Sequence, residues 1–290
     1  MRILLTGGSG DLGHRLAKSL AERGDVPVCL DIRPPRHTHG EFIAGSILDR
    51  DLLAQSLAGV DGVVHIAAWH GIHEFRQEKD VYDFWDLNVT GTFYVFEAAA
   101  QAGVQKVVYL SSTSVDEWPG VYGHTKILAE EIARTYAERH GLHVISLRPR
   151  AFIPYWNRTV YTSFVEWAKW FWAGAVHIDD VNQATLQAID LLAQSPPPHP
   201  LVLPVDGAYD YSPADLAQWD AAGPGSTFKK YYAPYYDLAL SHGLDPAQPP
   251  TILDLSETRR WLGYAPRYSL KNLLQELEAF GADGPPPPNL

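Results

Sequence analysis

The chain of 290 residues contains a single cysteine, Cys29, and no apolar run long enough to cross a bilayer. One cysteine excludes an intrachain disulfide and a cysteine cluster for a metal, and a bilayer span needs about 20 apolar residues. Basic residues are also few, since 23 Lys and Arg stand against 34 Asp and Glu, giving a net charge of −11. This excess of acid disfavours non-specific binding to nucleic acid or to an anionic membrane. We therefore expect a cytoplasmic protein whose partners include neither nucleic acid nor membrane.

The first half of the chain alternates short β-branched runs with longer segments of helical periodicity. The runs are "RILLT", "VPVCLD", "GVVHIAA", "KVVYLSS" and "HVISLRP". Between the first two, Leu12, Leu16 and Leu20 recur at the i, i+4, i+8 spacing of one helix face. Alternating strands and helices, with strands that are apolar almost throughout, predict an α/β protein with a parallel sheet.

The composition changes in the second half of the chain. Residues 154–175 are dense in aromatic side chains, 176–205 return to α/β character, and 206–280 are rich in loops and tyrosine. We predict a main domain over 1–153, and we expect the chain to return to this domain over 176–205. The segments 154–175 and 206–280 then form a small, irregular lobe. The proline-rich end, 281–290, is expected to be a disordered tail.

A glycine-rich turn lies between the first predicted strand and the first predicted helix. Gly7, Gly10 and Gly13 form the pattern G-x-x-G-x-x-G within "LLTGGSGDLG". Glycine permits a tight turn and close approach of a pyrophosphate, and the start of the helix supplies oriented N–H groups. The second strand ends at Asp31, where a carboxylate can accept a hydrogen bond from a ribose hydroxyl. Because this carboxylate would repel a 2′-phosphate, the sequence favours NAD over NADP, although Arg33 follows closely.

A possible proton-transfer site lies further along the chain. Tyr122 and Lys126 stand four residues apart in a predicted helix, so their side chains share one face. Ten residues before the tyrosine, Ser112 follows a buried strand, and open parallel sheets bind ligands beyond the carboxyl ends of their strands. Free tyrosine, with a pKa of about 10, is a poor base at neutral pH. A nearby ammonium and a positive nicotinamide would favour the phenolate and lower this pKa.

The order of these motifs resembles that of the extended short-chain dehydrogenases/reductases, in particular the NAD-dependent epimerase/dehydratase family. The matching stretches are "TGGSGDLG", "HIAA", "NVTGT", "SST", "YGHTK", "LRPRAFIP", "VHIDDV" and "DLSETRRWLGYAP", so the resemblance spans nearly the whole chain. It implies a Rossmann-type doubly wound parallel sheet with a smaller, irregular C-terminal substrate lobe, and a homodimer. It also implies Tyr122 as the general acid/base, Ser112 as the partner of the reacting oxygen, and Lys126 as a ligand of the nicotinamide ribose.

The same resemblance assigns a set of residues to NAD. They are Gly7, Ser9, Gly10, Asp11, Leu12, Gly13, Asp31, Arg33, Ser46, Ile47, Ile66, Ala67, Ala68, Asn88, Tyr122, Lys126 and Pro149. Ser46 departs from the aspartate that the family usually carries there, but a serine can still accept from the adenine amino group.

Departures from the family pattern bear on the activity. Dehydratases follow their catalytic hydroxyl residue with Asp-Glu, whereas Ser112 is followed by Thr113. Nucleotide-sugar epimerases usually carry an asparagine where this chain has Ala151. Only 22 residues separate Pro154 from His177 of the next family motif. Uronate dehydrogenases share this brevity and have an arginine resembling Arg158, whose planar fork could pair with a substrate carboxylate. A surface arginine packed on nearby tryptophans is the alternative.

The connection between the predicted catalytic serine and tyrosine is shorter than the family usually has, so another segment, such as 69–85, is expected to close the pocket. The candidate substrate residues are Trp69, His70, Ser112, Thr113, Ala151 and Arg158, with His73 and Trp118 as further candidates for the lining. Ordinary aromatic packing or a solvated loop is the alternative for the aromatic and histidine residues. No third ligand accompanies the two histidines, and we expect no metal.

The sequence leaves three functions open. The first is an NAD-dependent oxidoreductase acting at a secondary alcohol of a sugar or sugar acid. The second is a nucleotide-sugar 4-epimerase that retains its NAD, and net NADH formation separates the two. The third is a non-catalytic, NAD(P)-sensing regulator, which the presence of both Tyr122 and Lys126 disfavours.

Overall fold

The computed structural model describes residues 1–36, 39–117 and 120–288. Within these ranges seven strands form one sheet, ordered β3-β2-β1-β4-β5-β6-β7, in which every neighbouring pair is parallel. The strands are β1 (Arg2–Thr6), β2 (Val26–Asp31), β3 (Glu41–Ala44), β4 (Gly62–His65), β5 (Lys106–Leu110), β6 (His143–Pro149) and β7 (Leu201–Val205). The direction of winding reverses between β1 and β4, so the predicted doubly wound α/β fold is confirmed.

Successive side chains of the central strands enter cores on opposite faces of the sheet. Leu5 of β1 packs in the core beneath α1 and α9, whereas the adjacent Leu4 packs in the core beneath α5 and α7. Both side chains are fully buried. This period of two explains why the strands are apolar almost throughout, since both faces are covered by helices.

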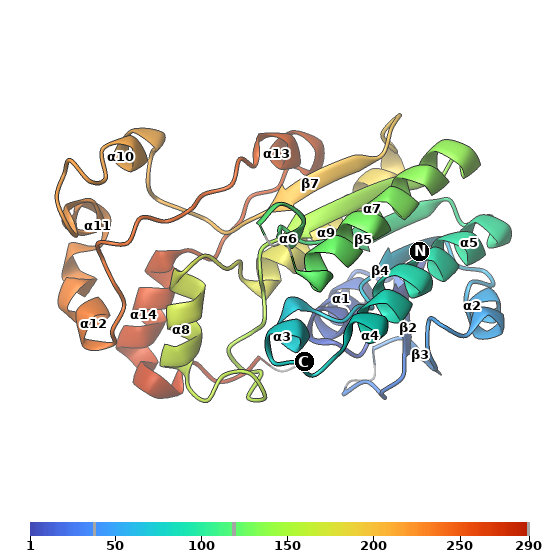
Figure 1. Cartoon of the computed structure of the whole chain (residues 1–290), viewed down its shortest axis with the longest axis horizontal. Helices are drawn as coiled ribbons and strands as arrows, with labels where there is room; N and C mark the ends of the chain where they lie inside the picture. Colours follow the sequence, from blue (N-terminus) through green and yellow to red (C-terminus); the bar gives the residue numbers. More distant parts are fainter. Residues whose placement is uncertain (37–38, 118–119, 289–290) are drawn as a thin grey trace.

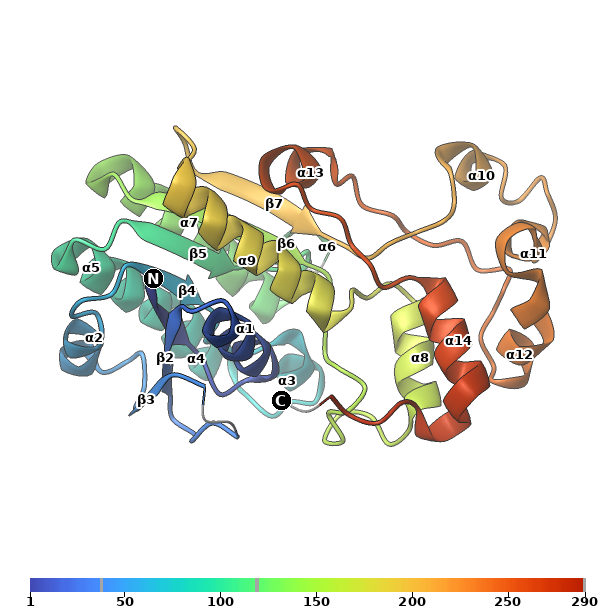
Figure 2. The same cartoon turned by 180° about the vertical axis from the view of Figure 1, so that it is seen from behind.

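The helices of the main body form the two outer layers. They are α1 (Asp11–Glu22), α2 (Arg50–Ser56), α3 (Gly71–Phe75), α4 (Val81–Phe84), the π-helix η1 (Trp85–Gly91), α5 (Thr92–Ala102), α6 (Ser114–Glu117), α7 (Val121–His140), α9 (Ile178–Gln194) and α13 (Ser256–Leu262). Figure 1 shows α5 and α7 in front of the sheet, and Figure 2 shows α1 and α9 covering the opposite face.

The remaining helices form a smaller lobe at one end of the molecule (Figure 1). They are α8 (Phe164–Trp172), α10 (Pro213–Ala217), α11 (Ser226–Tyr232), η2 (Ala233–Tyr235), α12 (Tyr236–Ser241), α14 (Leu270–Phe280) and η3 (Gly281–Asp283). Its core is aromatic on one side and leucine-rich on the other, with Trp167 of α8 and Leu274 of α14 both buried. The segment predicted as a tail is described as far as residue 288, and the carbonyl of Pro286 accepts a hydrogen bond from Tyr155 Oη at 3.1 Å.

The lobe lies at the carboxyl end of the sheet, and the arrowhead of β7 points toward it in Figure 2. All seven parallel strands therefore end at the edge that faces the lobe, the edge at which such sheets bind ligands. In the described parts of the chain, none of the helices combines the length and apolar character that crossing a membrane demands.

Candidate active site

The turn from β1 to α1 is a backbone surface with little side-chain cover. Gly7 has φ +70°, and a Cβ there would lie 2.9 Å from Cα of Ala67, so only glycine fits. A Cβ on Gly10 would instead have one near atom, the Gly7 oxygen at 3.3 Å. Gly10 is the N-cap of α1, and no side chain caps this helix. The amides at the start of α1 are therefore placed as a cradle for a pyrophosphate.

Asp31 closes the glycine-rich turn from the end of β2. Its Oδ2 accepts from the backbone N–H of Ser9 and its Oδ1 from that of Arg33, each at 3.0 Å. The Ser9 hydroxyl donates in turn to the Arg33 carbonyl at 2.7 Å. The Asp31 carboxylate is buried, whereas the Arg33 side chain is 73% exposed, with Nε 3.9 Å from Oδ1 of Asp31. Each carboxylate oxygen keeps a lone pair for a further donor such as a ribose hydroxyl.

The other residues assigned to NAD lie in the first turn of α1 or at and just after the ends of the strands. Leu12, Ile47, Ile66 and Pro149 are buried, and Ala67 and Ala68 are half-buried. Ser46 is engaged in its own turn, because its hydroxyl accepts from the backbone N–H of Leu48 at 3.1 Å. Asp11, in the first turn of α1, pairs with Arg36 at 3.2 Å.

Asn88 links the segment that follows β4 to the helix α7. Its Oδ1 accepts from the Trp69 N–H at 2.8 Å, and its Nδ2 donates to the Trp69 carbonyl and to Thr125 Oγ1, both at 3.0 Å. The sequence assigned this asparagine to NAD. In the structure its amide bonds to the protein, so it fixes the segment that follows Ala67 and Ala68.

The structure brings Ser112, Tyr122 and Lys126 together at the end of β5. Tyr122 is the second residue of α7, and Lys126 follows one turn later, with Nζ 5.8 Å from the centre of the tyrosine ring. Lys126 Nζ donates to the carbonyl of Leu110, the last residue of β5, at 2.7 Å. The Ser112 hydroxyl donates to Ser114 Oγ at 3.1 Å, and its interaction with Tyr122 lowers the pKa of the tyrosine. Their side chains are all buried, at 8% exposure for the tyrosine and 3% for the lysine.

Burial governs the titration of this site. It raises the pKa of Tyr122 to about 12, and the hydrogen bond with Ser112 opposes the rise. It lowers the pKa of Lys126 to about 7, and attraction to Glu130 opposes that fall. The sequence analysis predicts that an ammonium and a positive nicotinamide together lower the pKa of Tyr122, and burial of the phenol acts against this effect.

The segment 69–85 packs beside this site. The Trp69 ring is half-buried, with Lys79 Nζ 4.3 Å from its centre and the His73 ring edge-on at 5.1 Å. The His70 side chain is exposed, and its ring stacks on that of His73 at 5.7 Å. Among the described residues no group of three or more His, Cys, Asp or Glu could hold a metal ion. Trp118, the remaining lining candidate, lies outside the described residues.

The lobe segment 155–162 crosses from the main body to the lobe. Asn157 Nδ2 donates to Asp11 Oδ2 at 2.9 Å, so this segment touches the glycine-rich turn directly. Arg158 is exposed, and its guanidinium donates to the carbonyls of Thr162 and Asp283 at 3.5 and 3.3 Å. Ala151 is exposed at the start of the same connection, and Thr113 is buried next to Ser112.

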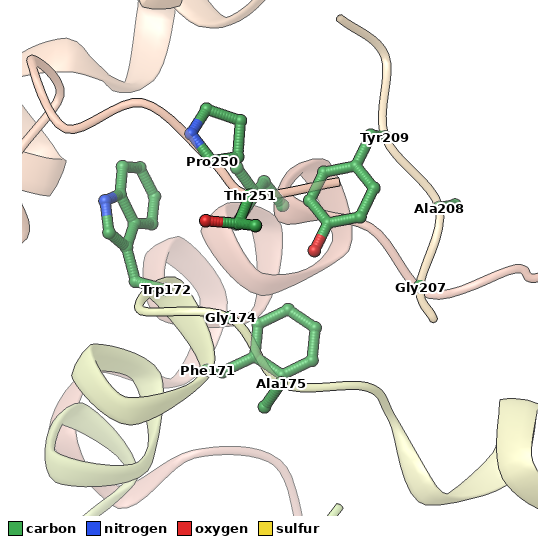
Figure 3. A pocket seen from close by; sticks show the side chains of 10 residues that line it. Phe171, Trp172, Gly174, Ala175, Gly207, Ala208, Tyr209, Pro250 and Thr251 are labelled. Carbon is green, nitrogen blue, oxygen red and sulfur yellow. The ribbon is translucent and has the colours of Figure 1, made fainter. Parts of the chain in front are cut away.

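A small hollow lies within the lobe, with room for about one water molecule. Figure 3 shows the rings of Phe171, Trp172 and Tyr209 around it, with Pro250 and Thr251 on the far wall. Ser112, Tyr122 and Lys126 are absent from its lining. The hollow is too small for a sugar, so the candidate active site is the edge of the sheet.

Two contacts at the site were missed by the sequence analysis. Glu74 accepts from backbone amides at the start of α7, and Asn157 donates to Asp11. In both pairs the partners are far apart in the sequence, 47 and 146 residues respectively, and neither belongs to a periodic pattern. Only the fold brings them together.

Comparison with known proteins bears on this site. A family model described as the NAD dependent epimerase/dehydratase family matches residues 3–166. The chain is 30% identical to "Uncharacterized protein y4nG" of Sinorhizobium fredii, over 94% of this chain and 76% of that protein. It is 29% identical to a 3 beta-hydroxysteroid dehydrogenase/Delta 5-->4-isomerase of Mycobacterium tuberculosis, over 57% of this chain and 50% of that protein.

A uronate dehydrogenase of Pseudomonas putida is 28% identical, over 53% of this chain and 62% of that protein. These two dehydrogenases are thus matched over half to three-fifths of their own lengths. Among solved structures, a UDP-glucuronic acid 4-epimerase from Bacillus cereus superposes with a TM-score of 0.69 at 21% identity, covering 95% of this chain and 97% of that one. At this identity the likeness shows a shared fold.

Proposed function

The chain belongs to the NAD-dependent epimerase/dehydratase family, and we propose that it catalyses reversible hydride transfer at a secondary alcohol of a free sugar or sugar acid. The observation that carries the proposal is the grouping of Ser112, Tyr122 and Lys126 at the end of β5, two strands from the glycine-rich turn. A proton-transfer group and a dinucleotide cradle at the same end of the sheet would support this reaction. The buried triplet also argues against a purely regulatory role.

The residues present fit NAD. The open backbone at Gly10 and the uncapped start of α1 suit the pyrophosphate, and Asp31 offers a carboxylate for a ribose hydroxyl. We propose that NAD is preferred over NADP, because the buried carboxylate would lie near a 2′-phosphate. The exposed Arg33 side chain lies close enough to reduce that preference.

The proposed mechanism couples two transfers. NAD, held by the glycine-rich turn and Asp31, would supply a hydride acceptor for oxidation, and its reduced form a hydride donor for the reverse direction. During oxidation Tyr122 Oη takes the proton of the alcohol as its C–O bond becomes a carbonyl, and the same atom gives the proton back during reduction. Ser112 Oγ donates a hydrogen bond to the reacting oxygen. The Lys126 ammonium favours the phenolate, which matters because burial raises the pKa of Tyr122 to about 12.

The proposed substrate class follows from the connection after β6. Ala151 offers no polar side chain, and only 22 residues lie between Pro154 and His177, which leaves little chain to grip a nucleotide. The relative named uronate dehydrogenase supports a sugar acid. Arg158 is the proposed partner of its carboxylate, and it would exchange its contacts with the carbonyls of Thr162 and Asp283 for that carboxylate.

A nucleotide-sugar 4-epimerase with retained NAD is the second candidate. The observation that favours it is the hydrogen bond between Asn157 and Asp11, which holds the lobe segment on the glycine-rich turn and would slow the exit of a dinucleotide. A dehydrogenase must release NADH in every cycle, whereas an epimerase keeps its cofactor. Net NADH formation from NAD⁺ and a free sugar supports the first candidate. Interconversion of nucleotide-sugar epimers without net NADH supports the second. If neither reaction occurs, both candidate functions are excluded.

We also propose a homodimer built on the outer faces of α4, η1, α5 and α7. Large apolar side chains are exposed there, and these helices lie side by side in Figure 1. They are Val81, Tyr82, Trp85, Phe93, Ile127 and Leu128. Burial of such side chains against a second copy would remove them from water. Sedimentation of the wild type and of Ile127→Glu tests the proposal, which predicts a dimer and a monomer respectively.

A further inference from the structure

The start of α7 lacks a cap from its own sequence. Its N-cap residue is Gly120, and no side chain at that position accepts from the first turn. The first N–H groups of a helix have no partner within the helix, so a buried helix start needs acceptors from elsewhere. In α7 these acceptors also affect the proposed acid/base, because Tyr122 is the second residue of the helix.

Glu74 supplies those acceptors from another element, the short helix α3. Its Oε1 accepts from the backbone N–H of Val121 at 2.7 Å, and its Oε2 accepts from that of Tyr122 at 2.9 Å. A carboxylate at the N-terminus of a 20-residue helix is also favoured by the helix dipole. One side chain thus fixes the backbone of the proposed acid/base.

The same helix contacts the ring of Tyr122. A Cβ on Gly71 would lie 3.3 Å from Cδ1 of the tyrosine, so the glycine backbone packs against the ring edge. Gly71 and Glu74 are three residues apart and therefore share one face of α3. On another side the ring of Phe84 approaches the tyrosine ring edge-on, with centroids 6.5 Å apart. The helix α3 therefore contacts both the ring and the backbone of Tyr122.

The segment that carries Glu74 has an anchor of its own. Asn88 binds both the N–H and the carbonyl of Trp69, five residues before Glu74, and also binds Thr125 on α7. Removing the Glu74 carboxylate therefore leaves the segment attached to α7 by a second contact. A variant at Glu74 can therefore measure what the carboxylate alone contributes.

We propose that Glu74 is a positioning residue for the reaction: it caps α7 from the neighbouring helix and so sets the place of the Tyr122 hydroxyl. The proposal rests on the function proposed above, in which Tyr122 moves the proton. Glu74 acts through the backbone of Tyr122.

The test compares Glu74→Ala and Glu74→Gln with a matched control, Glu78→Gln. Glu78 lies in the same segment, and its carboxylate pairs with Arg76 at 3.8 Å. We expect Glu74→Ala to lower kcat by up to about 100-fold, because misplacement by about 1 Å of a reacting group has that effect. The affinity for NAD should stay at the wild-type value. Glu74→Gln should recover part of the loss, since its amide oxygen still accepts a hydrogen bond, and Glu78→Gln should behave as wild type.

A second readout needs no substrate. Hydrogen exchange at the amides of residues 121 and 122 should be faster in Glu74→Ala than in wild type or Glu78→Gln. If the wild type turns over none of the substrates, the proposed function fails, and the exchange rates still decide the role of Glu74. Unchanged exchange, an unchanged kcat, or a fall in kcat accompanied by an equal loss of NAD affinity would overturn the proposal.

Discussion

Lys126 donates a hydrogen bond from Nζ to the backbone carbonyl of Leu110 at 2.7 Å, across the gap between α7 and the last residue of β5. The lysine is 3% exposed, and burial lowers its pKa to about 7. The ε-amino group is held 5.8 Å from the centre of the Tyr122 ring, at the end of the strand that also leads to Ser112, and it carries its charge below about pH 7. The same contact makes the lysine part of the packing between helix and sheet.

Replacing Lys126 by methionine should separate those two roles. Methionine keeps the length and the apolar stem but removes the donor to the Leu110 carbonyl, so the free energy of unfolding should fall by about 1–3 kcal/mol. Turnover should fall by about 100-fold or more, because the phenolate loses its nearest cation. Steady-state rates and denaturant unfolding would measure the two effects. Retained turnover would contradict the role given to the ammonium.

Tyr122→Phe removes only the hydroxyl that we propose moves the proton. We expect kcat to fall by a factor of about 10² to 10⁴. The affinity for NAD, measured by titration, should be retained because the glycine-rich turn and Asp31 are untouched. Tyr82→Phe, at an exposed tyrosine of α4, is the matched control and should leave kcat unchanged. An active Tyr122→Phe enzyme would refute the mechanism.

Asp31→Ala tests the choice of dinucleotide. A hydrogen bond to a charged group contributes about 1.5–3 kcal/mol, so the ratio of NAD to NADP affinity should fall by about 10- to 100-fold. In Asp31→Ser the ratio of NAD to NADP affinity should fall less, because the serine hydroxyl can still accept from the N–H of Ser9. The exposed Asp51 on α2 provides a control substitution to alanine. An unchanged ratio in Asp31→Ala would discredit the assignment.

Much of the fold could be predicted from the sequence because its determinants are local or periodic. The apolar runs became the strands, and the spacing of Gly7, Gly10 and Gly13 placed the turn at the start of α1. The chain from Val81 to Ala102 runs through α4, η1 and α5. The π-helical turn around Asn88 has no periodic signature, and it places that side chain to reach Trp69.

What could not be predicted depends on contacts between distant segments. In the sequence Glu74 cannot be distinguished from any other loop carboxylate. Its role follows only from the fold, which brings α3 against the start of α7. The pKa of Tyr122 likewise depends on burial, which the lysine four residues later does not reveal. The exposed surroundings of Arg158 and its contact with Asp283 also follow only from the packing of the lobe.

Arg158→Ala tests the carboxylate hypothesis. If the guanidinium pairs with a substrate carboxylate, KM for a sugar acid should rise by about tenfold or more, and KM for the matching neutral sugar should change little. Arg260→Ala, at an exposed arginine of α13, is the control. Equal effects on both substrates would remove Arg158 from the substrate site.

From the burial of His65 we predict that the free energy of unfolding falls in acid. Its ring nitrogens lie 2.7 Å from Thr6 Oγ1 and 2.9 Å from Thr92 Oγ1, and burial, with repulsion from Lys126, lowers the pKa of His65 to about 3. The histidine of the unfolded chain binds a proton below about pH 6.5, whereas the buried ring of the folded protein does not. The free energy of unfolding should therefore fall as the pH drops from 6.5 toward 3, by up to about 1.4 kcal/mol per pH unit.

Urea unfolding of the wild type and of His65→Gln across this range measures that contribution. His177, whose pKa burial lowers to about 4, acts in the same direction, and Asp180, whose pKa burial raises to about 6, acts in the opposite one. Both are present in the two proteins, so the difference between their slopes isolates His65. Identical slopes would show that the ring is not held neutral.

The central claim, that this chain oxidises a secondary alcohol of a free sugar or sugar acid with NAD⁺, is tested most directly by net NADH formation. The purified protein would be mixed with NAD⁺ and, separately, with free uronic acids, neutral aldoses, 3β-hydroxysteroids and UDP- or dTDP-sugars, with Tyr122→Phe in parallel. We predict stoichiometric NADH from a free sugar or sugar acid, and none from Tyr122→Phe. Interconversion of a nucleotide sugar with its epimer, without net NADH, would contradict the claim.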